Sequence, residues 1–197
     1  MRFLQKLAQI VPAAVLAIAV GVPLYALPAM LSLPRGQRPG VEKLTISQAA
    51  RQLRASGKTG WALVEAARAL VGQRMHYCRR NSYDSAARAF ERGYGYCMQH
   101  AYALADLLTR LGLEAKVVQA FRNRFADGNV TSHAWVSVTV DGETRYVDPL
   151  FWDAQANRPT FTPLSEVTGI SPAFRAFTWW GAAAVNAHRF YSTGKDM

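Results

Sequence analysis

The chain has 197 residues and half of them are apolar, which predicts one globular domain of ordinary size with a substantial hydrophobic core. The formal net charge of +10 at pH 7 would suit an anionic partner, but no nucleic-acid-binding motif accompanies it, so we expect no nucleic-acid partner. Two cysteines exclude a disulfide framework. A single bridge between Cys78 and Cys97 would need an oxidising compartment, and it would block any chemistry at Cys97.

The N-terminal segment is typical of a membrane helix. The run from Ile10 to Leu33 is almost wholly apolar and exceeds the ~20 residues that cross a bilayer core. A basic start precedes it, as in a signal peptide or an uncleaved anchor, and its length favours the anchor. We therefore expect residues 1–33 to form a transmembrane or signal helix. Basic residues on both flanks leave its orientation open, but export to the periplasmic or extracytoplasmic side is the simplest use of such a segment.

A punctuated stretch follows the apolar run. Prolines, glycines and arginines between residues 33 and 40 (LPRGQRPG) predict a linker over residues 34–44, and residues 45–197 would then form the folded domain. An arginine cluster stands ahead of Cys97, and contact with anionic membrane lipids would suit a basic domain tethered to a membrane. The members of this cluster are Arg79, Arg80, Arg88 and Arg92.

The hydrophobic periodicity predicts helices in the first half of the domain and strands in the second. The helices are expected over residues 45–56, with Thr45 or Ser47 as the cap, and over residues 61–72, 85–92 and 97–110. The strands are expected over residues 114–120, 132–140 and 143–150, followed by loops and a last helix near residues 180–188. This order indicates an α+β fold in which the N-terminal helices pack on an antiparallel sheet, because a βαβ repeat would alternate the two kinds of element.

Cys97 stands where a glycine-rich turn enters a helix, in the stretch GYGYCMQHAYALADLL (residues 93–108). A cysteine on an apolar helix face is often a small core residue. In the first helical turn, however, the positive end of the helix dipole favours a thiolate, and the backbone N–H groups have no partner within the helix. Cys97 is therefore a candidate nucleophile whose own N–H would be one oxyanion donor.

His133 and Asp148 lie on consecutive predicted strands that Asp141-Gly142, the strongest short hairpin signal, would join. A two-residue turn pairs Val140 with Glu143. It makes His133 and Asp148 diagonal neighbours on one face of the sheet, with Cβ atoms roughly 7 Å apart or less. A turn longer by one residue would point Asp148 to the opposite face. An imidazole held by a carboxylate has a fixed tautomer and a stabilised cation, as a general base needs.

Several segments in this order resemble the transglutaminase-like superfamily. They are GYC (residues 95–97) leading into an apolar helix, LGLEAKVV (residues 111–118), HAWV (residues 133–136) and DP (residues 148–149). The resemblance implies a papain-like core with a Cys, His, Asp triad in this chain order. Cys97 would be the nucleophile, His133 the general base and Asp148 its orienter. It also implies thioester chemistry on an amide, because the family contains proteases, amidases and acyl transferases. The second oxyanion donor stays open among Tyr77, Gln99 and Trp61.

We therefore expect a membrane-anchored enzyme that uses Cys97 to act on a protein or peptide amide, most simply by hydrolysis, with no metal and no cofactor. Cross-linking by acyl transfer is the alternative within this chemistry. A non-catalytic, membrane-anchored binding module on the same fold is the alternative without it. A structural zinc ion is a third interpretation, because two cysteines and two histidines can form a tetrahedral set. Its ligands would be His76, Cys78, Cys97 and His100.

Overall fold

The structure is a computed structural model that describes residues 2–33 and 36–194. Its helices are α1 (Arg2–Leu31), α2 (Ile46–Ala55), α3 (Gly60–Arg74), α4 (Ala86–Arg92), α5 (Cys97–Arg110) and α6 (Pro172–Thr193). Its strands are β1 (His76–Tyr77), β2 (Tyr94–Gly95), β3 (Glu114–Phe125), β4 (Val130–Val140), β5 (Glu143–Val147), β6 (Trp152–Asp153), β7 (Arg158–Pro159), β8 (Phe161–Pro163) and β9 (Thr168–Gly169). The four helices predicted for the first half of the domain are confirmed to within two residues at each end. Thr45, and not Ser47, caps α2, because its side chain accepts the N–H of Gln48.

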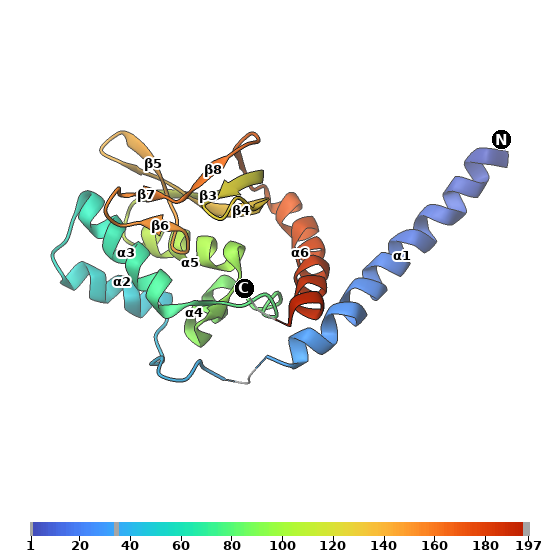
Figure 1. Cartoon of the computed structure of the whole chain (residues 1–197), viewed down its shortest axis with the longest axis horizontal. Helices are drawn as coiled ribbons and strands as arrows, with labels where there is room; N and C mark the ends of the chain where they lie inside the picture. Colours follow the sequence, from blue (N-terminus) through green and yellow to red (C-terminus); the bar gives the residue numbers. More distant parts are fainter. Residues whose placement is uncertain (1, 34–35, 195–197) are drawn as a thin grey trace.

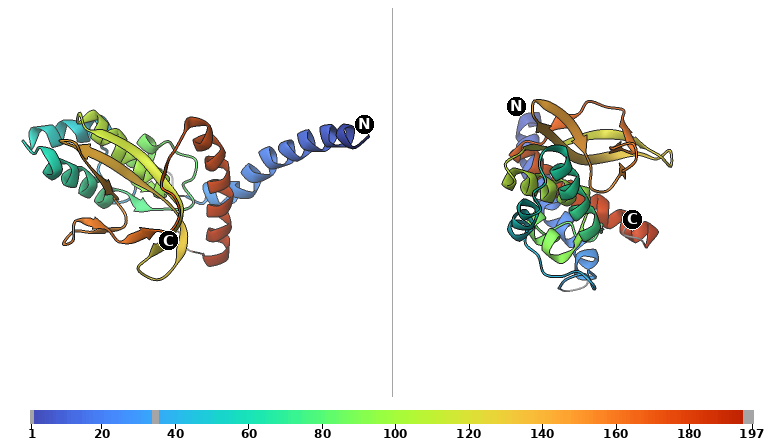
Figure 2. Two further views of the ribbon diagram at one scale, coloured as in Figure 1. Left: turned by 90° about the horizontal axis from the view of Figure 1, so that it is seen from above. Right: turned by 90° about the vertical axis from the view of Figure 1, so that its left-hand side faces the viewer.

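An antiparallel sheet and a layer of helices form the body of the molecule (Figure 1, Figure 2). The sheet order is β5-β4-β3-β8, and the short β9 also pairs with β3. Helices α2 to α5 lie on one face of this sheet, and α5 contacts α2, α3, α4, β3 and β4. Leu104 and Leu108 of α5 are fully buried in one cluster with Val136 and Val138 of β4. The predicted α+β fold, with helices packed on an antiparallel sheet, is therefore confirmed.

The β4–β5 hairpin has the predicted two-residue turn. Val140 pairs with Glu143, and the same register continues to Val136 opposite Val147. Asp141 and Gly142 both have positive φ, at 49° and 83°, as the favoured hairpin turn of this length requires. Because side chains alternate between the two faces of a strand, this register directs the side chains of His133 and Asp148 to the same face.

A short parallel strand pair links the segment after α3 to the glycine-rich turn. His76 of β1 pairs with Tyr94 of β2, and Tyr77 pairs with Gly95. The sequence analysis did not predict these strands, because two residues are too few to display an alternation of apolar and polar side chains. The pairing places Tyr77 beside the turn that leads into Cys97.

The C-terminal part of the chain is more regular than predicted. The region after residue 151 was expected to consist of loops, but it contributes the short strands β6 to β9. The last helix covers Pro172–Thr193 and not residues 180–188 alone. A proline at the first helical position is compatible with a helix, since its missing N–H would have had no partner there. Pro172 therefore marks the start of α6, and the other two prolines of this region lie in the short strands β7 and β8.

Helix α1 projects from the body, and its C-terminal end packs on α6 (Figure 1). Tyr25 Oη hydrogen-bonds His188 Nδ1 at 3.2 Å, and Tyr191 Oη donates to the carbonyl of Tyr25 at 2.9 Å. Ala26 and Ala187 are buried between the two helices. The segment Ala14–Leu31 is long and apolar enough to cross a membrane, and only 11% of it is buried in the structure. By length and composition α1 therefore fits an anchor or a signal helix.

The expected division into anchor, linker and domain stays a prediction, and residues 34–35 of the linker lie outside the described residues. The following part of the linker is bound to the body, since the N–H of Arg38 donates to the carbonyl of Arg92 at 2.7 Å.

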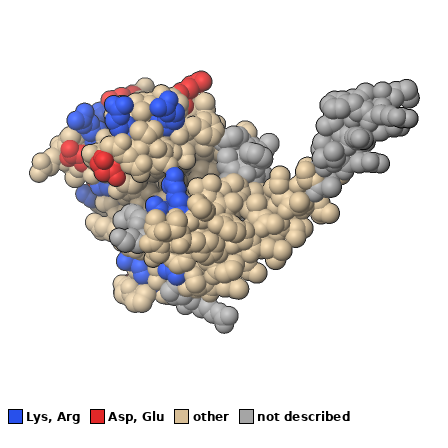
Figure 3. Space-filling view, turned by 45° about the vertical axis from the view of Figure 1, so that its right-hand side comes forward, with Lys and Arg blue, Asp and Glu red and all other residues tan. Residues whose placement is uncertain are grey.

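Part of the arginine cluster is used inside the molecule. Arg92 is buried and pairs with Asp84 at 2.6 Å, and Arg88 contacts the same carboxylate. Arg80 donates to the carbonyl of Ser32, just beyond the end of α1, at 2.9 Å. On the face seen in Figure 3, Lys and Arg side chains lie on the upper, middle and lower parts of the body, and the described surface leading to α1 carries none. Packing therefore accounts for several of the arginines that the sequence analysis assigned to lipid contact.

Gly72 of α3 approaches the loop that follows Asp148, and we expect Gly72→Ala to destabilise the fold. A Cβ at this position would overlap the carbonyl oxygen of the buried Pro149. In an exposed helix the same change would stabilise by about 1 kcal/mol, but overpacking against backbone costs about 1–3 kcal/mol. Urea unfolding should therefore give a lower free energy for Gly72→Ala. Gly169→Ala is the control, because a Cβ there meets nothing within 4 Å. Equal values for the two variants would contradict the close approach.

Candidate active site

Cys97 is the first residue of α5, and the turn before it is held by Gln99. The N–H of Tyr96 donates to Gln99 Oε1 at 3.0 Å, and Gln99 Nε2 donates to the carbonyl of Asp84 at 2.8 Å. The helix therefore begins at one defined residue, with Cys97 in the first turn where N–H groups point outward. Cys97 is half-buried, and neither it nor Cys78 forms a disulfide in the structure.

His133 and Asp148 meet across the hairpin, as the register predicts. Nε2 of His133 hydrogen-bonds Oδ2 of Asp148, and both side chains are buried. Oδ1 of Asp148 accepts the N–H groups of Leu150 and Phe151 at 2.6 and 2.9 Å. These two donors fix the orientation of the carboxylate. Because a carboxylate only accepts hydrogen bonds, Nε2 carries a proton and Nδ1 is the nitrogen left for chemistry.

Aromatic rings enclose the imidazole of His133. The ring centroids of Phe161, Phe151 and Phe125 lie 4.9, 5.1 and 5.6 Å away, all in edge-to-face orientations. Trp135 is fully buried and stacks beside the imidazole at 6.0 Å, so it shields that side of the ring from water. This enclosure leaves His133 4% exposed.

Electrostatic interactions outweigh burial in their effect on the pKa of His133. Burial by itself lowers the pKa of the imidazole, but the charge and hydrogen bond of Asp148, followed by the hydrogen bond and charge of Cys97, raise it to about 10. The side chains of Cys97 and His133 are thus in contact. The structure brings together all three residues that the sequence analysis singled out: a thiol at a helix N-terminus, an imidazole and a buried carboxylate. Such a series can hold a thiolate–imidazolium pair.

Of the three candidates for the second oxyanion donor, only Tyr77 remains at the site. Gln99 is used in the turn, as described above. Trp61 packs under Arg145, with the guanidinium 4.4 Å from its ring centre, and lines a different pocket. Burial and the nearby charge of Cys97 raise the pKa of Tyr77, so its hydroxyl remains a proton donor at neutral pH.

The proposed zinc ligands do not assemble. Among residues 2–33 and 36–194, no group of three or more His, Cys, Asp and Glu side chains is placed to hold a metal ion. His100 is fully buried, and its ring nitrogens lie 3.1 Å from the carbonyl of Tyr96 and 3.0 Å from that of Met75. Its ring also stacks on Tyr77 at 6.4 Å. His100 is therefore a structural residue that supports the segment carrying Tyr77, and the zinc interpretation is wrong.

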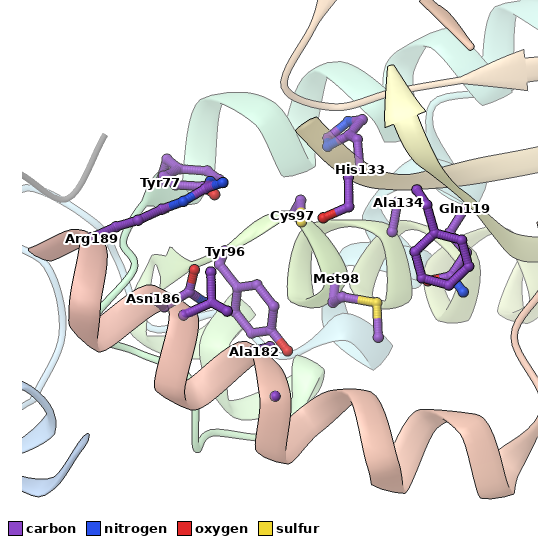
Figure 4. Close-up of a pocket in the computed structure, with 14 residues that line it drawn as sticks. Tyr77, Tyr96, Cys97, Met98, Gln119, His133, Ala134, Ala182, Asn186 and Arg189 are labelled. Carbon is purple, nitrogen blue, oxygen red and sulfur yellow. The ribbon is translucent and has the colours of Figure 1, made fainter. Parts of the chain in front are cut away.

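Two cavities open beside Cys97 and share a wall made by Tyr77, Cys97, Ser132, His133 and Arg189. The α6 cavity, of about 270 Å³, lies between α5, the sheet and the α6 residues Ala182, Val185, Asn186 and Arg189 (Figure 4). The hairpin cavity, of about 370 Å³, lies against the β3–β4 turn and Phe151. The sequence analysis did not include α6 in the site. The spacing of these α6 residues follows one helix face, but such a face is equally typical of ordinary packing.

A family model described as the transglutaminase-like superfamily matches residues 47–149, just over half of the chain. The chain belongs to the transglutaminase-like superfamily. Cys97, His133 and Asp148 all lie within the matched part of this transglutaminase-like domain. No curated protein matches the sequence.

Several solved bacterial structures are similar to this transglutaminase-like protein, and two of them are described here. The periplasmic domain of TgpA from Pseudomonas aeruginosa has a TM-score of 0.43 and 23% identity, over 64% of this chain and 47% of that one. LapG from Legionella pneumophila, in an EGTA-treated form, has a TM-score of 0.46 and 15% identity, over 84% of this chain and 97% of that one. This chain thus spans about half the length of the TgpA domain.

Asp148→Asn should lower the pH at which His133 loses its proton. The substitution removes the charge that raises the pKa of His133 and leaves burial, which lowers it. NMR titration of the imidazole signal, assigned by its absence in His133→Ala, would measure the change. The wild-type signal should titrate near pH 10 and the variant signal at a much lower pH.

The pairing of His133 with Asp148 also predicts how the stability of the fold changes with pH. The folded-state pKa of His133 lies above the unfolded value of about 6.5, so its contribution is complete below pH 6.5 and disappears as the pH rises to about 10. The free energy of unfolding should therefore fall across this range more steeply for the wild type than for Asp148→Asn. Parallel curves would contradict the assignment of the raised pKa to Asp148.

Proposed function

We propose that this transglutaminase-like domain is a cysteine enzyme that cleaves a protein or peptide amide through a thioester on Cys97. The observation that carries the proposal is the series of contacts from Asp148 through His133 to Cys97 at the N-terminus of α5. Acyl transfer through a cysteine requires an activated thiol, a proton carrier beside it and a group that orients the carrier. A binding module on the same fold would need none of these three groups in contact.

The chemistry follows from the positions of the protons. The Cys97 thiolate attacks the carbonyl carbon of the amide, and the N–H of Cys97 and the hydroxyl of Tyr77 stabilise the oxyanion. The His133 imidazolium then gives its proton to the departing amine, which leaves a thioester and a neutral imidazole. Water attacks the thioester while His133 takes a proton from it. Collapse of this second adduct releases a carboxylic acid and restores the thiolate–imidazolium pair.

Hydrolysis fits this chain better than cross-linking does. Transfer to an amine needs a second site that holds an amine next to the thioester and excludes water. The lining of the hairpin cavity includes polar groups of the β3–β4 turn, such as Asp127 and Asn129. This lining would admit water beside His133, so water would reach the acyl group on Cys97 before an amine does.

The N-terminal helix supports a membrane-bound location for this activity. α1 is apolar over Ala14–Leu31, and its C-terminal end packs on α6, which forms one wall of the α6 cavity. The site would therefore lie close to the membrane surface, and an extracytoplasmic side is the simplest result of an N-terminal hydrophobic segment. Substrates would be proteins or peptides that reach this surface.

Iodoacetamide should label Cys97 rapidly at pH 6.5, in the full chain held in a nonionic detergent. An unperturbed thiol, with a pKa of ~8.5, is only about 1% ionised at that pH. Loss of the thiolate–imidazolium pair should therefore slow labelling by up to about 100-fold in His133→Ala, and Asp148→Asn should slow it as well. Peptide mass spectrometry of quenched samples would give the rates at Cys97.

The buried Cys78 is the background for this measurement, so all variants should also carry Cys78→Ala. Slow labelling of the parent protein at pH 6.5, with equal rates in both variants, would reject the nucleophile and favour the binding module.

Hydrolysis and transfer can be separated with p-nitrophenyl acetate as an acyl donor. The ester should acetylate Cys97 with release of p-nitrophenolate, and water should then release acetate even when glycinamide is present in excess. Cys97→Ser is the control for non-enzymatic acetylation. N-acetylglycinamide as the main product would instead assign the domain to acyl transfer.

A further inference from the structure

Arg189 of α6 lies between the two cavities at the candidate nucleophile. Its guanidinium Nη2 donates to Thr131 Oγ1 of β4 at 3.0 Å, so the side chain bridges α6 and the sheet across the cleft. In Figure 4 it extends from α6 toward Tyr77, and it lines both cavities together with Cys97 and His133. The charge of Arg189 also acts on the phenol of Tyr77. The guanidinium therefore stands next to the place where a substrate carbonyl would sit.

No described carboxylate pairs with Arg189. Arg92, by contrast, is held by Asp84 at 2.6 Å. A guanidinium has five N–H donors in a planar fork, and the neutral hydroxyl of Thr131 takes one of them. The residues that line the α6 cavity include no Asp or Glu among them. Arg189 thus presents a positive charge and spare donors to a partly enclosed space that contains no acid.

The rest of the α6 cavity suits an aliphatic chain that ends in an acid. Met98, Ala182 and Val185 supply apolar walls on either side of the space. Asn186 is buried and donates to Ser82 at 3.2 Å, which fixes this turn of α6. A carboxylate matches the planar fork of an arginine in two parallel hydrogen bonds, so one cation at the end of an apolar slot selects for this group.

We propose that Arg189 is a substrate-binding residue that recognises a carboxylate beside the scissile amide, with the acid in the α6 cavity. The inference rests on the proposed cysteine chemistry and adds the substrate class. The hairpin cavity is the less suitable place, because Asp127 lines it and would repel the acid. The carboxylate belongs either to an acidic side chain or to the C-terminus of a peptide.

Two small alkylating reagents test the proposal without a known substrate. Iodoacetate and iodoacetamide differ in that one carries a carboxylate, and the ratio of their rates at Cys97 removes any change in the reactivity of the thiol. Arg189→Gln should lower the ratio of the iodoacetate rate to the iodoacetamide rate about tenfold, because it removes one charge-assisted hydrogen bond to the carboxylate. Arg189→Lys keeps the charge without the fork and should give an intermediate ratio.

Arg51→Gln is the matched control, because it removes the same charge from an exposed position on α2, which belongs to neither cavity. It should retain the wild-type ratio. An equal fall in Arg51→Gln and Arg189→Gln would mean that net charge alone attracts iodoacetate, and it would overturn the proposal. An unchanged ratio in Arg189→Gln, with Cys97 still labelled, would overturn it too and would leave the proposed enzyme intact.

Iodoacetylated amino acids distinguish the two sources of the carboxylate. Iodoacetyl-Glu-amide carries it on the side chain, iodoacetyl-Gln carries it at the C-terminus, and iodoacetyl-Gln-amide carries none. Faster labelling by the first supports recognition of an acidic residue, and faster labelling by the second supports recognition of a chain end. Equal rates for all three would contradict the inference.

Binding can also be followed without any reaction at Cys97. The Nε–H signal of Arg189, assigned by its absence in Arg189→Gln, should shift saturably on titration with N-acetylglutamate and not with N-acetylglutamine. If neither alkylating reagent labels Cys97, the proposed function fails, and this titration alone decides the carboxylate site. No shift with N-acetylglutamate would then overturn the site as well.

Discussion

The pairing of His133 with Asp148 depends on one feature of the backbone, the two-residue turn between β4 and β5. With Val140 opposite Glu143, both side chains point to the same face and their polar atoms meet. Insertion of one residue in that turn would send Asp148 to the other face. A buried ion pair gains little by itself, because both partners lose water. Here the N–H groups of Leu150 and Phe151 replace that water at the carboxylate, so the loop after β5 is as necessary as the strands.

The third member of the site comes from a different layer of the fold. Cys97 begins α5, the helix that packs on the sheet through Leu104 and Leu108. This packing positions the N-terminus of the helix relative to β4. The position of Cys97 is also maintained by Gln99, which hydrogen-bonds the N–H of Tyr96, and by the β1–β2 pair, which brings Tyr77 to the same turn. Close packing of this kind leaves few alternative positions for a side chain, and it therefore pre-organises the donors that an oxyanion would meet.

Helix α6 joins the site to the apolar N-terminal helix. One part of its surface packs on the C-terminal end of α1 through small residues such as Ala187, and another lines the α6 cavity through Asn186 and Arg189. The same helix therefore takes part in both the contact with α1 and the lining of the cavity. Helix α6 thus connects a segment whose composition suits a membrane with the cavity beside Cys97.

Local patterns in the sequence determined the helix and strand order, the hairpin turn and the choice of Cys97, His133 and Asp148 as candidate site residues. Each rests on interactions between residues close in the chain: a period of apolar side chains, a turn that needs positive φ, or the first turn of a helix. The tertiary structure decided what depends on distant contacts. It removed Gln99 and Trp61 as oxyanion donors, buried His100 as a structural residue, and brought Arg189 to the cleft from the far end of the chain. The sequence could not reveal these because helix faces that pack and helix faces that bind share the same spacing, and only the neighbouring elements distinguish them.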